Sequence, residues 1–179
     1  MSKKFTSSPL SSLSNVFELI GERWMLVTAE HGGVVNTMTA SWGSFGMLWN
    51  RAVCTCFIRP GRFTHELIEK SDYLSLSFLP EAYRNSLRIC GTVSGRHTDK
   101  FSLARLTPDF FVNNDEKSQK TQKVPYISQA ETAIICRKIY ASSLSPDSFL
   151  SEDIQPNYPN LDYHSVFISE ICEVLTAQN

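Results

Sequence analysis

Alternation of hydrophobic and polar residues is the strongest pattern in this chain. In YLSLSFL, over residues 73–79, apolar residues alternate with two serines, as in a strand that presents one face to a core. β-Branched and aromatic residues, which favour strands, are concentrated in further short runs. The strands expected from these patterns are Arg23–Ala29, Val34–Ser41, Ala52–Ile58, Tyr73–Leu79, Thr132–Ser142 and His164–Leu175, with a turn at His31–Gly33 between the first two.

Helical patterns are few and short. They predict helices over Phe63–Lys70, with Thr64 as its cap, over Glu81–Cys90, and over Thr98–Leu106, which begins with Thr98 and Asp99. The polar run Asn113–Lys123 predicts a loop or an exposed hairpin tip, and Ser143–Asp162, rich in Pro, Ser, Asp and Asn, predicts a long irregular excursion suited to a lid. Many short strands with few helices predict a mainly β barrel rather than a doubly wound α/β sheet.

Composition narrows the class of protein. With 42% hydrophobic and 20% charged residues among 179, the chain is typical of a globular domain. Its net charge of −1 provides no global positive field for a nucleic acid or an acidic membrane. No apolar run is long enough to cross a membrane, and serines interrupt the run that a signal peptide needs. We therefore expect a cytoplasmic protein with a flexible Ser-rich leader over residues 1–15 and a single domain over residues 16–179.

The five cysteines predict reduced, buried thiols, because their number is odd and their neighbours are apolar. Cys54 and Cys56 share one strand face, and without a second pair at ligand spacing they indicate core residues rather than a metal site. Neither a GxxxxGK[ST] loop nor a GxGxxG turn after a strand is present, so nucleotide triphosphatase and Rossmann functions are unsupported. No Ser/His/Asp or Cys/His spacing indicates a hydrolase.

Three segments carry candidate binding chemistry. In NTMTASWG, residues 36–43, hydroxyls at positions 37, 39 and 41 share one strand face, which leaves space and exposes backbone donors and acceptors to a planar heterocycle. In IRPGRFT, Arg59, Arg62 and a threonine lie where a strand meets a helix, a suitable position for a phosphate. In GTVSGRHTDK, a Gly/Ser turn again precedes basic residues and a helix.

Each segment also has an ordinary interpretation. The hydroxyl row suits a half-exposed strand, and the arginines suit solvated loops. Among the histidines, His65 follows Thr64 and is a candidate for the same anion, whereas His31 and His97 are expected to be solvated. His164 emerges from the predicted lid at the start of the last strand, where it either contacts a ligand or faces solvent.

Together the segments resemble a known family. TMTASWGSFGMLWN, then FIRPGRFTHELIEKSDYLSLSF, then SGRHTDKF, followed by CRKIY and NYPNLDYHSVFISEI, resemble the flavin reductase-like family with an FMN-binding split barrel, particularly its flavoredoxin-type members. The likeness covers nearly the whole chain after residue 20. It implies a Greek-key split β-barrel with short flanking helices, a homodimer, and FMN near the subunit interface.

The resemblance also implies site residues. It places Thr37, Met38, Thr39, Ala40, Ser41 and Trp42 along the isoalloxazine ring, Arg59, Pro60, Arg62, Thr64, Ser94, Gly95, Arg96 and Lys100 at the phosphate, and His164 where a nicotinamide docks. It assigns no catalytic residue and no metal. The implied function is an oxidoreductase that passes electrons from NAD(P)H through FMN to flavin or another acceptor. Two alternatives are an FMN-binding electron carrier served by a protein donor and a barrel that has lost the flavin.

Overall fold

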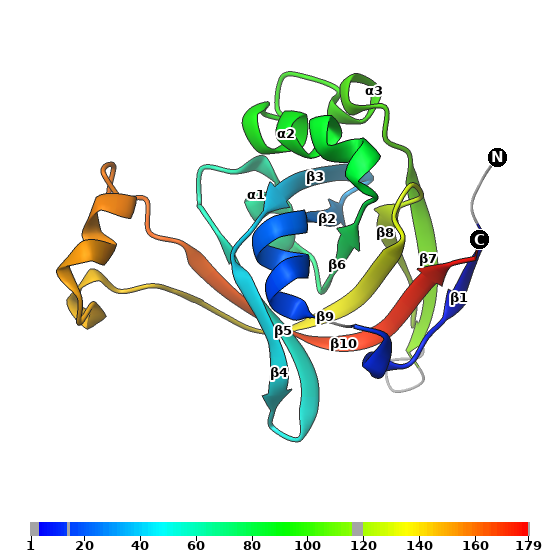
Figure 1. Ribbon diagram of the computed structural model, residues 1–179, viewed down its shortest axis with the longest axis horizontal. Helices are drawn as coiled ribbons and strands as arrows, with labels where there is room; N and C mark the ends of the chain where they lie inside the picture. Colours follow the sequence, from blue (N-terminus) through cyan, green and yellow to red (C-terminus); the bar gives the residue numbers. More distant parts are fainter. Residues whose placement is uncertain (1–3, 14, 116–119, 179) are drawn as a thin grey trace.

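A computed structural model describes residues 4–13, 15–115 and 120–178 of the chain (Figure 1). Its strands are β1 (Phe5–Ser7), β2 (Met25–His31), β3 (Val34–Ala40), β4 (Gly43–Leu48), β5 (Arg51–Ile58), β6 (Tyr73–Phe78), β7 (Pro108–Asp115), β8 (Lys120–Ile127), β9 (Thr132–Ser143) and β10 (Ser165–Ala177). Its helices are α1 (Phe63–Lys70), α2 (Arg84–Thr92) and α3 (Lys100–Ala104), with short helical turns η1 (Leu10–Ser12), η2 (Glu18–Arg23), η3 (Glu81–Tyr83), η4 (Pro146–Ser148) and η5 (Glu152–Asn157).

The main sheet has the strand order β3-β2-β6-β9-β10-β5-β4, with β1 paired to the end of β10. Neighbouring strands are antiparallel, and β7 and β8 form a separate hairpin. Each of the six strands expected from the sequence is present, with ends shifted by one or two residues. The prediction of a mainly β split barrel with short flanking helices is therefore confirmed.

The principal core lies inside the curved sheet, where α1 and the inward faces of β2, β3, β5, β6, β9 and β10 meet. In β6, the alternating Leu74, Leu76 and Phe78 all point into this core. Ser75 and Ser77 on the other face are also buried, because β8 covers them. Ser75 Oγ donates to the carbonyl of Pro125 at 2.6 Å, and Ser77 Oγ accepts from the amide of Ile127 at 3.2 Å. Hydrogen bonding thus makes a serine face compatible with burial.

Four strands were missed in the sequence: β4, β1, and the two strands β7 and β8 of the hairpin. β4 has the sequence GSFGML, whose two glycines weaken the strand signal, yet it pairs with β5 along its whole length. A side chain at Gly43 would bring its Cβ within 2.6 Å of the Thr55 carbonyl, so the two backbones approach too closely for any other residue. The second missed strand, β1, lies in the predicted flexible leader. Because Phe5–Ser7 pairs with Leu175–Ala177, this part of the leader belongs to the sheet.

The helices differ from expectation at their ends. α1 has the predicted bounds, but its N-cap is Arg62, so the prediction of a Thr64 cap is wrong. Thr64 is instead buried and its hydroxyl accepts from Asn36 Nδ2 at 2.8 Å. The helix expected over Thr98–Leu106 is present as the shorter α3, and Asp99 is its N-cap, since its carboxylate accepts from two backbone amides. Within the described residues, no helix is long and apolar enough to cross a membrane.

The polar segments form a hairpin and an arm. The run Asn113–Lys123 forms the outer ends of β7 and β8, where Asn113 pairs with Gln122, and residues 116–119 of its tip lie outside the described residues. The excursion Ser143–Asp162 contains η4 and η5 and projects away from the barrel (Figure 1). Four cysteines are buried as predicted, but Cys172 on β10 is exposed, so the expectation of five buried thiols is wrong for that residue.

Candidate functional site

Two adjoining cavities lie where β3 ends and α1 begins. The strand-end cleft, about 180 Å³, is lined by Met38–Trp42, Phe57, Arg59, Arg62 and His164. The smaller phosphate-sized pocket, about 70 Å³, is lined by Met38, Gly61–Thr64, Thr92–Ser94 and Lys100. Met38 and Arg62 line both cavities, so the two lie side by side and share a wall. The structure thereby brings together most of the residues that the sequence singled out from three separate segments.

Arg62 has the central position in this site. It is the N-cap of α1, and its guanidinium donates to the carbonyl of Gly91 at 2.6 Å, which links α1 to the end of α2. Arg59 lines only the cleft and is held by the arm: it forms a 2.6 Å ion pair with Asp162 and donates to the carbonyl of Asn157 at 2.7 Å. The Arg59 guanidinium keeps the pKa of Asp162 below its ordinary value. Arg59 is therefore already charge-compensated.

Lys100 is a buried cation at the back of the small pocket. Its ammonium donates to the carbonyls of Thr37 at 3.1 Å and Cys90 at 3.0 Å, which joins α3 to β3 and α2. Burial lowers the pKa of Lys100, and Arg62 nearby lowers it further. Among the described residues that line this pocket, two are cations and none is a carboxylate. Buried charge without a counter-ion is unfavourable, so the pocket favours a bound anion.

The second basic turn supplies less of the pocket than the sequence indicated. Ser94 lines it, but Gly95 and Arg96 do not. Gly95 packs against Asn36, whose Oδ1 would lie 2.1 Å from a Cβ at that position, so a larger residue there would displace the Asn36 side chain. Arg96 turns toward Glu66, with which it forms an ion pair, and its other nitrogen donates to the carbonyl of Gly61 at 3.0 Å. Pro60 is exposed and lines neither cavity.

The hydroxyl row on β3 is only partly directed at the cleft. Thr37 is fully buried, and its hydroxyl lies 2.9 Å from that of Thr28 on β2, its cross-strand partner. The prediction that Thr37 faces a ligand is therefore wrong for its side chain. Thr39 lines the cleft while its hydroxyl donates to the carbonyl of Leu87, and Ser41 and Trp42 continue the wall past the end of the strand. Trp42 is 45% exposed, which leaves one ring surface open.

His164 closes the cleft from the arm side. It is 6% exposed, its Nδ1 lies 2.9 Å from the hydroxyl of Tyr158, and its ring is 5.0 Å from that of Trp42. Burial, with Arg59 and Arg62 nearby, lowers the pKa of His164 to about 4, so the imidazole is neutral at pH 7. His164 is thus buried rather than solvated, and it lines the cleft. Tyr158 was missed, because nothing in the irregular arm sequence indicates its direction.

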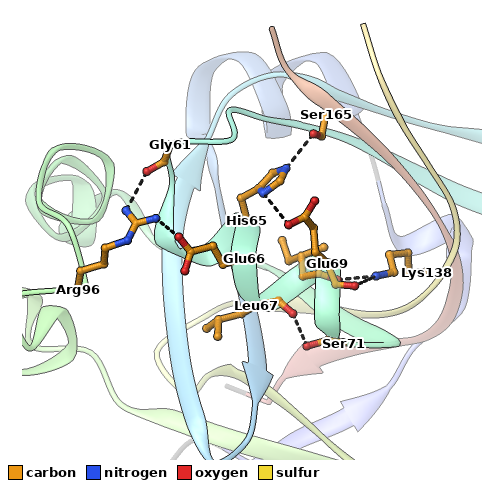
Figure 2. Close-up of polar contacts among 10 residues, drawn as sticks. Gly61, His65, Glu66, Leu67, Glu69, Ser71, Arg96, Lys138 and Ser165 are labelled. Carbon is orange, nitrogen blue, oxygen red and sulfur yellow. Dashed lines mark hydrogen bonds and ion pairs between the residues drawn. The ribbon is translucent and has the colours of Figure 1, made fainter. Parts of the chain in front are cut away.

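His65 does not face the small pocket, so its assignment to the anion is wrong. It lies on the opposite side of α1, where its Nε2 is 2.8 Å from the hydroxyl of Ser165 (Figure 2).

Next to the cleft, beyond Trp42, lies an apolar cavity of about 540 Å³ between η2, β4 and the arm. Phe17 at its rim is 87% exposed, and Trp42 and Phe57 separate it from the cleft. The sequence did not indicate this cavity, because η2 was not predicted.

The large antiparallel sheet with few helices has the fold of the split-barrel proteins. The chain belongs to the flavin reductase like domain family, whose sequence profile matches residues 18–179. This confirms the family suggested by the sequence motifs. No match was found among curated protein sequences.

Solved structures show the same fold. The FMN-binding domain of a flavin reductases-like enzyme from Shewanella baltica OS155 is 17% identical, covers 98% of this chain and 78% of its own, and has a TM-score of 0.67. Flavoredoxin from Methanosarcina acetivorans is 22% identical, with 85% and 67% covered and a TM-score of 0.59. Nitrilotriacetate monooxygenase component B from Bacillus cereus is 15% identical, with 94% and 80% covered and a TM-score of 0.63.

Proposed function

We propose that this protein binds FMN and acts as an oxidoreductase of the flavin reductase type, passing electrons from NAD(P)H to flavin or another acceptor. The observation that carries the proposal is that a cleft and a smaller cationic pocket lie side by side and share Met38 and Arg62 as lining residues. FMN joins a phosphate to a planar ring by a short chain. A small cationic pocket next to a cleft at a strand end fits the two parts of such a ligand.

The residues divide into two groups. Arg62, Ser94 and Lys100 would hold the phosphate, since two cations and a hydroxyl meet there without a carboxylate among the described lining residues. The backbone of residues 38–42 would receive the edge of the ring, with Trp42 and His164 at its sides. Arg96 lies outside the pocket lining and contacts Gly61, Glu66 and the ring of Phe63.

The chemistry of the reaction belongs to the cofactor. FMN, when bound, supplies reversible two-electron transfer between a hydride donor and an acceptor. The protein binds the cofactor, orients it and shields it from solvent. His164 stays neutral at pH 7, so it adds no positive charge beside the ring position, and its hydrogen bond to Tyr158 holds the imidazole in place. The 540 Å³ cavity beside Trp42 provides the space in which a second substrate would approach.

Anaerobic mixing with NADH or NADPH tests the reductase activity. The FMN-loaded protein is expected to lose its yellow colour at a rate well above that of free FMN at the same concentration, because a bound donor is held against the flavin. Stopped-flow absorbance measures the rate. Flavin that binds but stays oxidised would assign the protein to the electron-carrier class. A preparation that remains colourless after FMN is added would contradict both functions.

A homodimer is also proposed, on the basis of the family and of exposed apolar side chains. Met47 is 72% exposed and Trp49 58% exposed on the β4–β5 hairpin, and the Trp49 ring lies 6.5 Å from that of Tyr140 on β9. Such a cluster is typical of a contact surface. Sedimentation velocity is expected to show a dimer, and Met47→Glu to shift it toward monomer. A monomer at every concentration would contradict the proposal.

A further inference from the structure

Three side chains that the proposed function does not use form a chain of contacts on the far side of α1. Ser165 begins β10 and its Oγ lies 2.8 Å from His65 Nε2. The other ring nitrogen, Nδ1, lies 3.6 Å from Glu69 Oε2, one turn further along α1. Figure 2 shows His65 between the two, with its ring directed at the serine on one side and at the carboxylate on the other. A serine in contact with a histidine, which in turn faces a carboxylate, is the arrangement that activates a serine as a nucleophile.

The environment of His65 suits a general base. The side chain is 4% exposed, and its ring packs edge-on against Phe167 at 5.5 Å. Burial lowers the pKa of His65, against the opposing influence of Glu69 and Glu66 on its own helix, and Lys138 on β9 lowers it further. The imidazole is therefore neutral at pH 7. In the tautomer that carries the proton on Nδ1, on the side of Glu69, Nε2 would accept from the Ser165 hydroxyl.

Ser165 also faces an open cavity. A pocket of about 310 Å³ is lined by Glu69, Lys138, Ala141–Ser143, Ser165 and Phe167. Ser143 pairs with Ser165 across β9 and β10, and directly opposed residues on antiparallel strands point to the same face. The Lys138 ammonium, fixed at the C-terminal end of α1 by the carbonyl of Glu69 at 2.9 Å, stands at the same pocket. The Ser143 hydroxyl and the Lys138 ammonium thus line the same pocket as Ser165.

We propose that Ser165, His65 and Glu69 form a second active site that hydrolyses small esters. In the first step, Ser165 Oγ bonds to the ester carbonyl carbon as its proton passes to His65 Nε2. The bond from that carbon to the alcohol oxygen breaks, and the alcohol leaves with the proton from Nε2. Water then attacks the acyl group and gives a proton to Nε2; the carbonyl–Oγ bond breaks, the carboxylic acid leaves, and the proton returns to Oγ.

The pocket limits the substrate class. Phe167 and Ala141 are its apolar lining residues, which suits a short acyl chain. Ser142, Ser143 and Lys138 carry side-chain donors among the lining residues, and Lys138 keeps one N–H beyond its bonds to the carbonyls of Ile68 and Glu69. Such donors could bind the negative oxygen that develops during attack, the role of an oxyanion hole. Glu69 does not reach the reacting atoms and is a positioning residue. The lining has no residue in common with the two cavities of the proposed FMN site, so the activity does not depend on flavin.

Covalent labelling of the full-length protein tests the proposal. A fluorophosphonate probe is expected to modify Ser165, located by peptide mass spectrometry, with or without FMN. Hydrolysis of p-nitrophenyl acetate is expected to fall about a hundredfold in Ser165→Ala and in His65→Gln, the range for loss of a nucleophile or base. The matched controls are Ser102→Ala and His97→Gln, which replace exposed residues on α3 and in the loop before it and should leave hydrolysis unchanged.

The variant Glu69→Gln distinguishes a role of Glu69 in positioning His65 from a role in the stability of the fold. Because Glu69 raises the pKa of His65, its replacement is expected to move the acid limb of the hydrolysis–pH profile to lower pH as well as to reduce the rate. A stability effect would lower the rate without moving the limb. Labelling at another residue of the wild-type protein, or no labelling, overturns the proposal even if a variant fails to fold. Equal hydrolysis by folded Ser165→Ala and wild type overturns it as well.

Discussion

Replacing Arg62 with alanine is expected to weaken FMN binding by roughly tenfold to a hundredfold while leaving riboflavin binding nearly unchanged. The two ligands differ by the phosphate, and a hydrogen bond from a charged group contributes about 1.5–3 kcal/mol. Arg62 lines both cavities, and the carbonyl of Gly91 is the neutral partner of its guanidinium. Its positive charge therefore remains available to an anion. Fluorescence titration with each ligand measures the two affinities.

Arg96→Ala is the matched control for this experiment. From the sequence, Arg62 and Arg96 were equivalent candidates for the phosphate, but the structure pairs Arg96 with Glu66 outside the pocket lining. Its removal is expected to change FMN affinity far less than Arg62→Ala does. An equal loss of FMN and riboflavin in Arg62→Ala would show that Arg62 supports the fold of the cleft rather than the phosphate. An effect of Arg96→Ala as large as that of Arg62→Ala would contradict the charge assignment.

Stability is expected to decrease as the pH falls from about 6.5 to about 4, because His164 must be neutral in the folded state. Its pKa is about 4 when folded, through burial and the nearby arginines, whereas an unfolded histidine titrates near its ordinary value of about 6.5. Between these values the unfolded chain binds more protons, so acid favours unfolding. The stabilisation linked to neutral His164 is fully present above pH 6.5. Its complete loss at lower pH reduces the free energy of unfolding by about 3 kcal/mol.

Urea unfolding between pH 4 and 7 measures this dependence. His164→Gln, which cannot ionise, is expected to flatten the profile over this range, and His97→Gln, at an exposed position, should leave it unchanged. His65 has a lowered pKa as well, so some dependence of the same sign remains in the His164 variant. A profile as steep in His164→Gln as in wild type would mean that His164 is not the group that resists protonation.

Local sequence patterns predicted the strands well because each depends on a short-range property. Alternation in Tyr73–Leu79 and the β-branched run of Ala52–Ile58 identify strands whatever their partners are. β4 escaped detection because its two glycines carry no such signal, and its pairing with β5 supplies the stability that its composition lacks. The helix over Phe63–Lys70 was predicted with its bounds, but the direction of Thr64 was not, since its partner Asn36 lies 28 residues away.

By itself, the sequence determined the fold class, the family and the three segments that meet at the candidate site, because composition, periodicity and motif order are properties of the chain. Only the tertiary structure decided which basic residues keep their charge available. Arg62 and Lys100 bond to carbonyls, whereas Arg59 and Arg96 are compensated by Asp162 and Glu66. The contact between His65 and Ser165, 100 residues apart, was likewise beyond any spacing rule, because it arises where α1 packs against β10.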